Sequence, residues 1–397
     1  MEALFERSKQ KINSVPVTFV RSMMDKIHWE ERLTGIRGAR GVGKTTLLLQ
    51  YMKLNLPRNH TAIYLSLDNI WFNEHRLYEF TDMFVKRGGK YLFLDEVHKY
   101  PDWSQEIKNI YDDFPELKIV FTGSSLLEIL NARADLSRRA IVYEMQGFSF
   151  REYLNRNLKT DFPVVSLDDI LTSHNQLTER IISHVKVFEH FHNYLRNGYY
   201  PFYNEAPSLY YHKINEIVNM TIDIELPLLR GVDIAYVSKI KQLLQIISES
   251  VPFIPNVTKL SERIGISRKS LLFYLSGLEE SHLIIQLHKD ARGISKLQKP
   301  DRIYLENTNL MFALSSDKIQ TGSVRETFFA NQIKEFHRLS YTPRGDFLVD
   351  GTFTFEIGGK DKNMRQIEGI PGAFIAADDI EYGYINKIPL WLFGFLY

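Results

Sequence analysis

The chain has 397 residues, of which 44% are hydrophobic and 24% charged, and its formal net charge is +1. At roughly 100–200 residues per domain this length predicts two to four domains, and the near-zero charge excludes a global electrostatic attraction to nucleic acid or membranes. The sequence contains no cysteine, which excludes disulfides, thiolate metal sites and thiol nucleophiles. Because the N-terminus lacks an apolar segment of signal length and no run of about 18 apolar residues occurs, we expect a cytoplasmic protein.

The first part of the chain alternates apolar runs with helical patterns. Residues 1–32 predict one or two helices. Short apolar runs then predict buried strands at residues 33–37, 61–68, 90–97, 118–125 and 140–144. Helical patterns separate them at residues 46–52, 77–85 and 104–112. Such alternation is typical of a three-layer α/β fold, in which helices cover both faces of a parallel sheet.

A glycine-rich loop follows the first predicted strand. Its sequence, Gly38-Ala-Arg-Gly-Val-Gly-Lys-Thr45, fits the phosphate-loop pattern G-x-x-x-x-G-K-S/T between a strand and a helix. Glycines let backbone N–H groups point at phosphates, Lys44 would reach the β- and γ-phosphates, and the Thr45 hydroxyl would bind Mg²⁺. An ordinary glycine turn is the alternative, and the strand–loop–helix context disfavours it. The expected phosphate-binding residues are Gly38, Ala39, Arg40, Gly41, Val42, Gly43, Lys44, Thr45 and Thr46.

Two acids end the third predicted strand. Asp95 follows four apolar residues, and a carboxylate at a buried strand end is costly unless it has a partner. Beside a phosphate loop, Asp95 would hold Mg²⁺ through water and Glu96 would orient and activate the attacking water. Two carboxylates at a solvated strand end are the alternative interpretation.

Polar and basic residues also follow the fourth strand. Thr122 or Ser124 could sense the γ-phosphate, or could simply form a strand-to-turn transition. Arg138 and Arg139 precede the fifth strand, where an arginine could complete the site of a neighbouring subunit. A surface pair is an equally good interpretation of these two arginines.

The order of these motifs, followed by Ser-Phe-Arg-Glu at residues 149–152, resembles the AAA-type ATPases of bacteria and archaea. More narrowly, it resembles a group of prokaryotic ATP-binding proteins that join the ATPase core to a winged helix and a C-terminal nuclease-like domain. The resemblance implies ATP and Mg²⁺ as ligands. Its specific motifs cover about the first 155 residues, and the likeness over the rest of the chain is weaker.

Residues 156–232 predict a helical lid. Apolar residues at helical spacing cover residues 181–195, and the aromatic turn at residues 197–203 resembles the Gly-Tyr-Pro turn of that ATPase group. His184, His190 and His192 do not share one helical face, so they do not predict a metal site.

Residues 233–300 predict a helix-turn-helix with a wing. Helical patterns at residues 240–247, 257–264 and 268–280 precede a strand at residues 283–287. Ten basic and six acidic residues give this segment a net charge of +4. Arg268 and Lys269 begin the expected reading helix, and Lys289, Arg292 and Lys296 lie in the expected wing. DNA is therefore one candidate partner, and a protein is the other.

Residues 301–397 resemble the core of PD-(D/E)XK nucleases. Two strands around Asp350-Gly351 predict a hairpin. The residues implied by the resemblance are Glu326, Asp346, Glu356 and Lys360, supported by Gln366. The spacing departs from the pattern, because Glu356 and Lys360 are four residues apart with two glycines between them. Lys362 is the alternative lysine, and an inactive relic used for contacts is the alternative to metal-dependent cleavage.

We therefore predict an ATPase core at residues 1–155, a helical lid at 156–232, a winged helix at 233–300 and a restriction-endonuclease-like α/β domain at 301–397. The expected activity is Mg²⁺-dependent ATP hydrolysis coupled to DNA or protein binding. Two alternatives remain: an ATP-gated binding module without turnover, and an ATP-regulated metal-dependent DNA nuclease. The sequence predicts no membrane contact and leaves a monomer and a homo-oligomer equally open.

Overall fold

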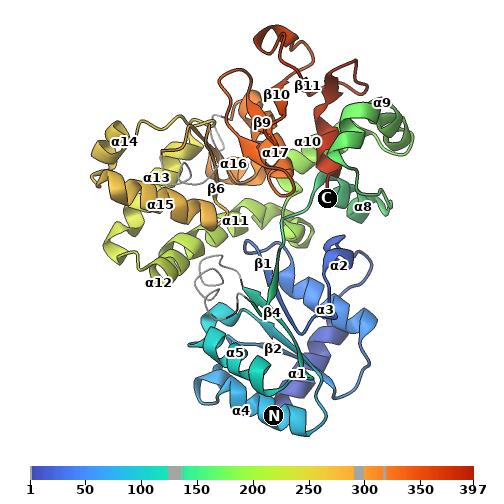
Figure 1. Ribbon diagram of the computed structural model, residues 1–397, viewed down its shortest axis with the longest axis vertical. Helices are drawn as coiled ribbons and strands as arrows, with labels where there is room; N and C mark the ends of the chain where they lie inside the picture. The colour runs from blue at the N-terminus through green and yellow to red at the C-terminus, as the bar shows by residue number, and fades with distance from the viewer. Residues whose placement is uncertain (1, 124–135, 137, 290–298, 316–318) are drawn as a thin grey trace. The chain divides into compact units, whose positions relative to one another are not determined.

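The structure is a computed structural model that describes residues 2–123, 136, 138–289, 299–315 and 319–397 (Figure 1). The chain divides into two compact units, Met1–Gly147 and Phe148–Tyr397. Each unit is described by itself below.

The first unit is built on a five-stranded sheet in the order β2-β3-β4-β1-β5. All neighbouring strands are parallel, as the alternation of strands and helices predicts. The strands are β1 (Leu33–Arg37), β2 (Ala62–Ser66), β3 (Tyr91–Asp95), β4 (Lys118–Gly123) and β5 (Ile141–Glu144).

Helices cover both faces of this sheet, which confirms the predicted three-layer α/β fold. On one face, α4 (Leu77–Lys86) and α5 (Trp103–Asp113) share a buried apolar cluster with the strands. On the other face, Tyr51 of α3 (Lys44–Asn55) packs against Phe93 of β3 with ring centroids 6.0 Å apart. The remaining elements are α1 (Glu2–Ser14), α2 (Met23–Lys26), η1 (Ile70–Asn73) and η2 (Val97–Lys99).

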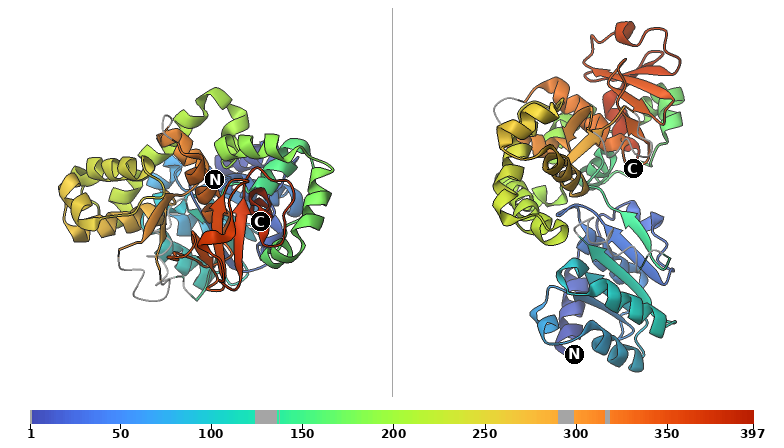
Figure 2. Two further views of the ribbon diagram at one scale, coloured as in Figure 1. Left: turned by 90° about the horizontal axis from the view of Figure 1, so that it is seen from above. Right: turned by 60° about the vertical axis from the view of Figure 1, so that its left-hand side comes forward.

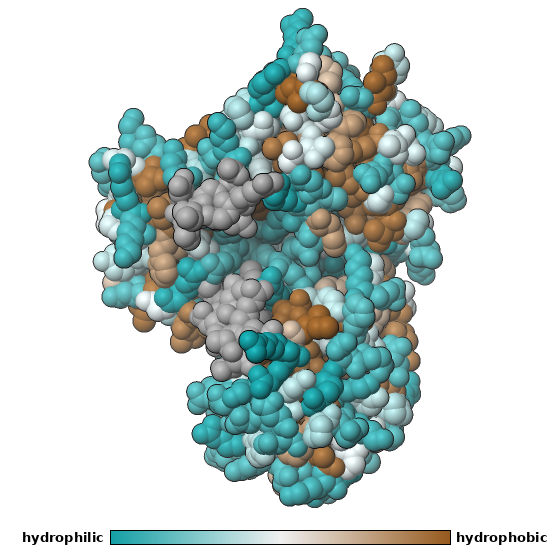
Figure 3. All heavy atoms as spheres, viewed as in Figure 1, coloured by the Kyte–Doolittle hydropathy of each residue, from teal (hydrophilic) through white to brown (hydrophobic). Residues whose placement is uncertain are grey.

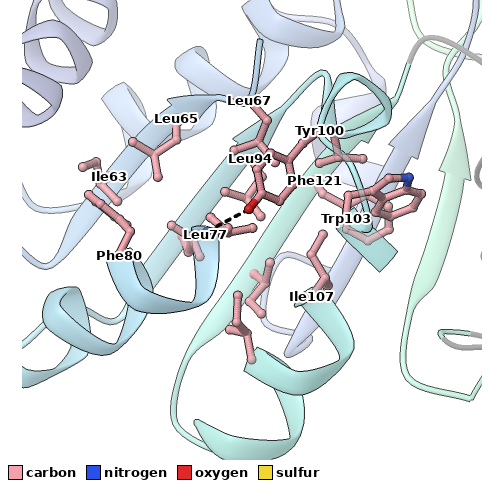
Figure 4. Packing of buried hydrophobic residues seen from close by; sticks show 14 of the residues in the cluster. Ile63, Leu65, Leu67, Leu77, Phe80, Leu94, Tyr100, Trp103, Ile107 and Phe121 are labelled. Carbon is pink, nitrogen blue, oxygen red and sulfur yellow. Dashed lines mark hydrogen bonds between the residues drawn. The ribbon is translucent and has the colours of Figure 1, made fainter. Parts of the chain in front are cut away.

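Figure 4 shows how the first face is packed. Leu94 and Phe121 of the central strands meet Trp103 and Ile107 of α5, and all four side chains are buried. Tyr100 belongs to the same apolar cluster, and its hydroxyl accepts a 3.1 Å hydrogen bond from the backbone N–H of Leu77, the first residue of α4, and donates to Glu106 Oε1 at 3.0 Å. This packing fixes the carboxyl ends of β3 and β4, where the predicted site residues lie.

The second unit begins with helices. The predicted helix at residues 181–195 is interrupted, because α9 ends at Ile182 and α10 begins at Val187. The helical elements are α8 (Phe150–Leu158), α9 (Leu167–Ile182), α10 (Val187–Asn197), η3 (Pro201–Glu205), η4 (Pro207–Leu209), α11 (Tyr210–Met220), η5 (Thr221–Glu225) and α12 (Leu226–Arg230).

Three further helices and a two-stranded sheet follow. The helices are preceded by η6 (Ile234–Tyr236) and lie together in Figures 1 and 2. They are α13 (Val237–Ser248), α14 (Val257–Ile264) and α15 (Arg268–Glu280). Antiparallel strands β6 (Ile284–Leu287) and β7 (Arg302–Leu305) form the sheet, and an antiparallel bridge joins Phe253 to Ile303. Strand β7 therefore pairs with the segment before residue 300, although the sequence places it with the last domain.

The C-terminal part contains a mixed five-stranded sheet in the order β12-β11-β10-β9-β8. Strands β8 to β10 are antiparallel, which includes the predicted hairpin around Asp350-Gly351, and β10 to β12 are parallel. Phe329 of α17 packs on the ring of Phe355 from β10. The elements are α16 (Thr308–Leu314), α17 (Thr321–Ile333), β8 (Leu339–Ser340), β9 (Phe347–Val349), β10 (Phe353–Gly358), η8 (Met364–Gln366), β11 (Ala373–Ala377), β12 (Lys387–Pro389) and η9 (Leu390–Phe395).

The Ser-Phe-Arg-Glu segment ties the start of the second unit to the last residues of the chain. Ser149 caps α8 by accepting from the N–H of Glu152 at 3.1 Å, as the Ser-x-x-Glu spacing favours. Its hydroxyl also donates to the carbonyl of Tyr397 at 2.6 Å, and Arg151 donates to the same carbonyl at 2.9 Å. Residues 148–155 and the predicted lid helix α10 thus belong to the same compact unit as the C-terminal residues, and Phe191 of α10 packs on Phe328 of α17.

No helix within the described ranges is long and apolar enough to cross a membrane. On the face drawn in Figure 3, hydrophilic side chains predominate and apolar ones form separate small groups.

Candidate functional site

The loop at residues 38–45, called the phosphate-type loop below, has the backbone conformation that its glycines predict. Gly38, Gly41 and Gly43 have φ angles of 151°, 78° and 102°, a region that favours glycine. A Cβ atom on Gly38 would lie 2.2 Å from the carbonyl oxygen of Met145, so only glycine fits there. The helix α3 begins at Lys44 directly after the loop, and its N-terminus directs N–H groups and a positive dipole end toward an anion.

Lys44 lies over the loop that would hold the phosphates. Its Nζ donates to the carbonyl of Gly38 at 2.7 Å and to that of Ala39 at 2.8 Å. The ammonium is therefore held at the loop rather than on a neighbouring helix, which places a positive charge where the sequence predicts phosphate binding.

Asp95 is buried at the end of β3 and accepts hydrogen bonds from hydroxyl groups of three elements. Thr45 Oγ1 and Tyr64 OH donate to its Oδ2 at 2.7 and 2.6 Å, and Thr122 Oγ1 donates to its Oδ1. Thr122 Oγ1 also accepts a 3.1 Å bond from the N–H of Glu96. The structure thus brings together Thr45, Asp95, Glu96 and Thr122, four of the residues that the sequence selects.

Tyr64 is a site residue that sequence reasoning missed. It lies in the middle of β2, in a run that reads as an apolar strand, so its hydroxyl gave no signal of its own. Burial, reinforced by the charge of Asp95, raises the pKa of Tyr64 well above its ordinary range. The hydroxyl therefore stays protonated and acts as a donor to Asp95.

Glu96 follows Asp95 in the chain and has a left-handed backbone, at φ 56°. Its Oε2 is 3.2 Å from Lys99 Nζ and 3.8 Å from both Arg40 Nη2 and His98 Nε2. Burial by itself raises the pKa of Glu96, but the charges of His98, Lys44, Lys99 and Arg40 outweigh it and lower this pKa below 4.5. Glu96 is therefore an ionised carboxylate at neutral pH and can accept a proton or orient a water molecule.

Arg21 is a second residue that the sequence did not reveal. Its guanidinium is buried and donates to the carbonyls of Val42 in the loop at 3.1 Å, Gln146 at 3.0 Å and Gly147 at 2.9 Å. It thus ties the phosphate-type loop to the last residues of the first unit.

The remaining selected residues of this unit do not meet at Asp95. Arg139 forms a bidentate ion pair with Asp112, at 2.9 and 3.0 Å, while Arg138 is exposed. Ser124 lies outside the described residues.

Thr45 and Asp95 suit a magnesium ion. Mg²⁺ prefers hard oxygen ligands and keeps several of its waters, and the two side chains offer a hydroxyl and a carboxylate 2.7 Å apart. Because the Thr45 hydroxyl donates a hydrogen bond to Asp95, the lone pairs of its oxygen are directed away from the carboxylate. The donor set therefore fits the predicted metal.

The carboxylates selected in the C-terminal part also converge, but around an arginine. Arg302 Nη1 from β7 lies 3.2 Å from Asp346 Oδ1 and 3.9 Å from Glu326 Oε2. Tyr304 OH, two residues along the same strand, donates to Glu326 Oε2 at 2.7 Å. Glu356 pairs with Lys362. We call Glu326, Asp346 and Glu356 the carboxylate cluster.

Lys360 does not reach this cluster. Its side chain is exposed, and its carbonyl accepts from Lys387 Nζ. Lys362 takes the position expected of Lys360, because the Gly358-Gly359 pair ends β10 and turns the chain back. Gln366 accepts from Lys362 Nζ at 2.9 Å, so it supports the lysine that pairs with Glu356.

In the carboxylate cluster, burial disfavours the ionised form of two of the three carboxyl groups. Burial and, to a smaller extent, repulsion from the charge of Asp346 raise the pKa of Glu326 to about 7. The hydrogen bond from Tyr304 and the charge of Arg302 lower this pKa but do not outweigh them. Burial likewise raises the pKa of Glu356. The cluster is therefore a closely packed set of ionisable groups whose charge is balanced mainly by Arg302 and Lys362.

Another group could hold a metal ion among the described residues. Ligand atoms of His192, Asp378 and Asp379 lie within 4.8 Å of one another, beside a cavity of about 230 Å³. Arg325 donates to Asp378 at 2.8 Å and to Asp379 at 3.0 Å, so both carboxylates already have a cationic partner. His184 and His190 do not join this group.

The basic residues selected for a nucleic-acid surface are exposed where the structure describes them. Arg268 and Lys269 form the first turn of α15, and Lys289 follows β6. Arg268 donates to Thr258 Oγ1 of α14. Arg292 and Lys296 lie outside the described residues.

A comparison with known protein families supports the interpretation of the first unit as an ATPase domain. Residues 30–154 match the family model described as "AAA domain", so the chain contains an AAA-family ATPase domain, and such a domain supports ATP binding and hydrolysis. No curated protein matches the sequence.

Two solved structures illustrate how distant the similar proteins are. The Walker-type ATPase PABY2304 of Pyrococcus abyssi is 12% identical, with 78% of this chain and 95% of that chain covered and a TM-score of 0.40. AMPPCP-bound DnaA from Aquifex aeolicus is 14% identical, with 65% and 84% covered and a TM-score of 0.26. At such low scores we draw no conclusion about activity from either structure.

Proposed function

We propose that the AAA domain in the first unit binds ATP together with Mg²⁺ and hydrolyses it. The observation that carries this proposal is the contact between Thr45 and Asp95, at 2.7 Å, with the ionised Glu96 next in the chain. These residues combine a phosphate-type loop, a pair of oxygen ligands and a base at one end of one sheet, as phosphoryl transfer to water requires.

The loop and Lys44 bind the phosphates in this proposal. Backbone N–H groups of the loop contact the phosphate oxygens, and Lys44 moves from the carbonyls of Gly38 and Ala39 to the β- and γ-phosphates. When bound, Mg²⁺ would supply positive charge that offsets the charge developing on the phosphates. Thr45 and Asp95 are the residues that would hold this ion, Thr45 through its hydroxyl oxygen and Asp95 through its carboxylate.

Glu96 positions the attacking water and accepts its proton. Thr122 bonds both Asp95 and the N–H of Glu96, so it links the metal side of the site to the base and is a candidate γ-phosphate sensor. Arg138 is the better candidate for an arginine finger acting on a second copy of the chain, because Asp112 holds Arg139.

Phosphate release from ATP by the full chain, with and without Mg²⁺, tests this proposal. We expect Mg²⁺-dependent turnover by the wild type and at least about 100-fold slower turnover by Glu96→Gln, with nucleotide binding retained. Glu74→Gln, an exposed change in the same unit, is the matched control. Equal rates for wild type and Glu96→Gln would reject the role of Glu96. A long-lived ATP complex without phosphate release by the wild type would favour an ATP-gated binding module.

We further propose that α13, α14, α15, β6 and β7 form a winged helix that contacts duplex DNA or a protein. Exposed Arg268 and Lys269 at the start of α15 support the DNA alternative. Measuring the ATPase rate with and without duplex DNA, while recording the assembly size, distinguishes coupling to DNA from a protein-binding role.

The nuclease alternative is less favoured. The carboxylate cluster has the residue types for metal binding, but Arg302 and Lys362 already pair with its members. Incubating DNA with the full chain and Mg²⁺ or Mn²⁺ tests for nuclease activity, with Asp346→Ala and Glu356→Ala as controls. Cleavage by the wild type that both substitutions abolish would revive this alternative.

A further inference from the structure

We propose that Tyr64 is a positioning residue that fixes Asp95 for the Mg²⁺ of a bound nucleotide. This inference rests on the proposed function, since it concerns the same metal. Tyr64 lies on β2 beside β3, where it is in register with Phe93. Phe93 and Asp95 are two residues apart in β3 and share one face of the sheet, so the Tyr64 hydroxyl reaches Asp95 along the strand, at 2.6 Å.

The number of acceptor positions on Asp95 shows what Tyr64 does. An ionised carboxylate has two oxygens with about four lone-pair positions in all. Thr45 and Tyr64 donate to Oδ2, and Thr122 donates to Oδ1. Among the described side chains, these bonds leave one position of Oδ1 for a metal-bound water.

Tyr64 therefore fixes both the orientation of Asp95 and the oxygen that it presents. Without the Tyr64 hydroxyl, Oδ2 would keep only Thr45, and the carboxylate could rotate or direct a second lone pair at the ion. Mg²⁺ tolerates such changes poorly, because it demands near-octahedral geometry and keeps several waters. Hydrogen-bond partners of this kind are known to tune the affinity of metal sites.

Two residues of helix α1 contact Tyr64. Lys11 Nζ donates to the Tyr64 hydroxyl at 3.5 Å and lies 4.9 Å from the ring centroid. Ser8 of the same helix accepts from the Tyr64 N–H at 2.9 Å. A cation behind the hydroxyl oxygen polarises the O–H group toward Asp95 and strengthens its donation. The metal site is thus organised partly by a helix that contains no part of the phosphate-type loop.

The test compares wild type with Tyr64→Phe, which removes the hydroxyl and keeps the ring. The affinity of the full chain for a fluorescent ADP analogue is measured across a Mg²⁺ titration, and Mn²⁺ binding is followed by electron paramagnetic resonance. We expect Tyr64→Phe to need about 10-fold more Mg²⁺ for half-maximal effect, with unchanged nucleotide affinity in EDTA. Tyr91→Phe removes a hydroxyl at the opposite end of β3 from Asp95 and should behave like wild type.

The outcomes separate this inference from the proposed function. Mg²⁺-dependent nucleotide binding by the wild type with the same Mg²⁺ requirement in Tyr64→Phe overturns the role of Tyr64 alone. Nucleotide binding by the wild type that does not respond to Mg²⁺ overturns both proposals. If Tyr64→Phe does not fold, Lys11→Met is the alternative test, because it changes an exposed side chain. Lys11→Met should also raise the Mg²⁺ concentration needed for half-maximal effect. An unchanged Mg²⁺ requirement overturns the inference.

Discussion

The hydroxyl of Thr45 donates a 2.7 Å hydrogen bond to Oδ2 of Asp95 across a sequence separation of 50 residues. Thr45 is the second residue of α3 and Asp95 ends β3, so the bond joins the helix that follows the loop to the end of β3.

Removing this hydroxyl should weaken the response to Mg²⁺. We expect Thr45→Ala to lose about 10-fold or more in Mg²⁺-dependent nucleotide affinity, because the proposed metal ligand and a donor to Asp95 disappear together. Thr45→Ser keeps the hydroxyl and should stay within a few-fold of wild type. Nucleotide titrations with and without Mg²⁺ measure both effects, and equal behaviour of the two variants would contradict the assignment.

Gly38→Ala should disrupt the loop. The new Cβ would meet the carbonyl oxygen of Met145 at 2.2 Å, at a φ of 151° that disfavours other residues. We expect a loss of about 1–3 kcal/mol in the free energy of unfolding, together with loss of nucleotide binding. Denaturant titration measures the stability.

A matched glycine provides the control. A Cβ on Gly322 of α17 meets nothing within 4 Å, so Gly322→Ala should stabilise the chain by about 0.4–1 kcal/mol. If Gly38→Ala were as stable as Gly322→Ala, the close approach of the loop to Met145 would be wrong.

Glu326 makes stability depend on pH. Its pKa is raised from 4.5 to about 7, mainly by burial, so the unfolded chain releases this proton at lower pH than the folded chain. The contribution of Glu326 to stability is therefore present at pH 4 and is lost as the pH rises from about 4.5 through 7.

Glu326→Gln should remove that loss. We expect the variant to match wild type near pH 4 and to exceed it at pH 8 by on the order of 1–3 kcal/mol. Thermal unfolding across this range measures the difference, with exposed Glu368→Gln as the control. A difference between Glu326→Gln and wild type that does not change with pH would contradict the raised pKa.

Arg302→Gln should lower the free energy of unfolding at pH 8, whereas Glu326→Gln should raise it. Arg302 lies between Asp346 and Glu326, and removing one partner of a buried ion pair leaves uncompensated charge that costs about 3–5 kcal/mol. Because part of the side chains is accessible, at 15–19%, solvent reduces this figure, and we expect about 1–3 kcal/mol. Unfolding at pH 8 should show the full loss, and a loss that is no smaller at pH 5 would argue against a charge effect.

Lys269→Ala tests the proposed contact with DNA. If Lys269 contacts a phosphate, its removal should weaken binding to all duplexes alike and reduce the slope of affinity against salt by about 1. Lys86→Ala in the first unit, where Lys86 pairs with Asp82, is the control. An unchanged salt slope in Lys269→Ala would favour a protein partner for α15.

Much of the first unit follows from the sequence by itself. Parallel strands buried on both faces give continuous apolar runs, and the loop pattern places Gly38–Thr45 between β1 and α3. The acids after Tyr91-Leu-Phe-Leu94 then fall at the same sheet edge as the loop. The apolar runs and the loop pattern were therefore enough to predict that Thr45, Asp95, Glu96 and Thr122 lie near the carboxyl ends of strands in one parallel sheet.

The partners of these residues are decided only by tertiary structure. Tyr64 reads as an apolar strand residue, and its hydroxyl acquires a role only because β2 lies beside β3. Arg21 precedes every motif, yet its guanidinium contacts the loop and residues 146–147.

The second unit shows the same division. The sequence indicated the hairpin and the three carboxylates, but the chain turns at Gly358-Gly359, so Lys362 rather than Lys360 meets Glu356. Arg302 lies on a strand that pairs with β6, and no local pattern predicts that it pairs with Asp346. Periodicity reports which face a residue occupies within its own element, whereas charge pairing depends on which elements pack together, and that is a property of the folded chain.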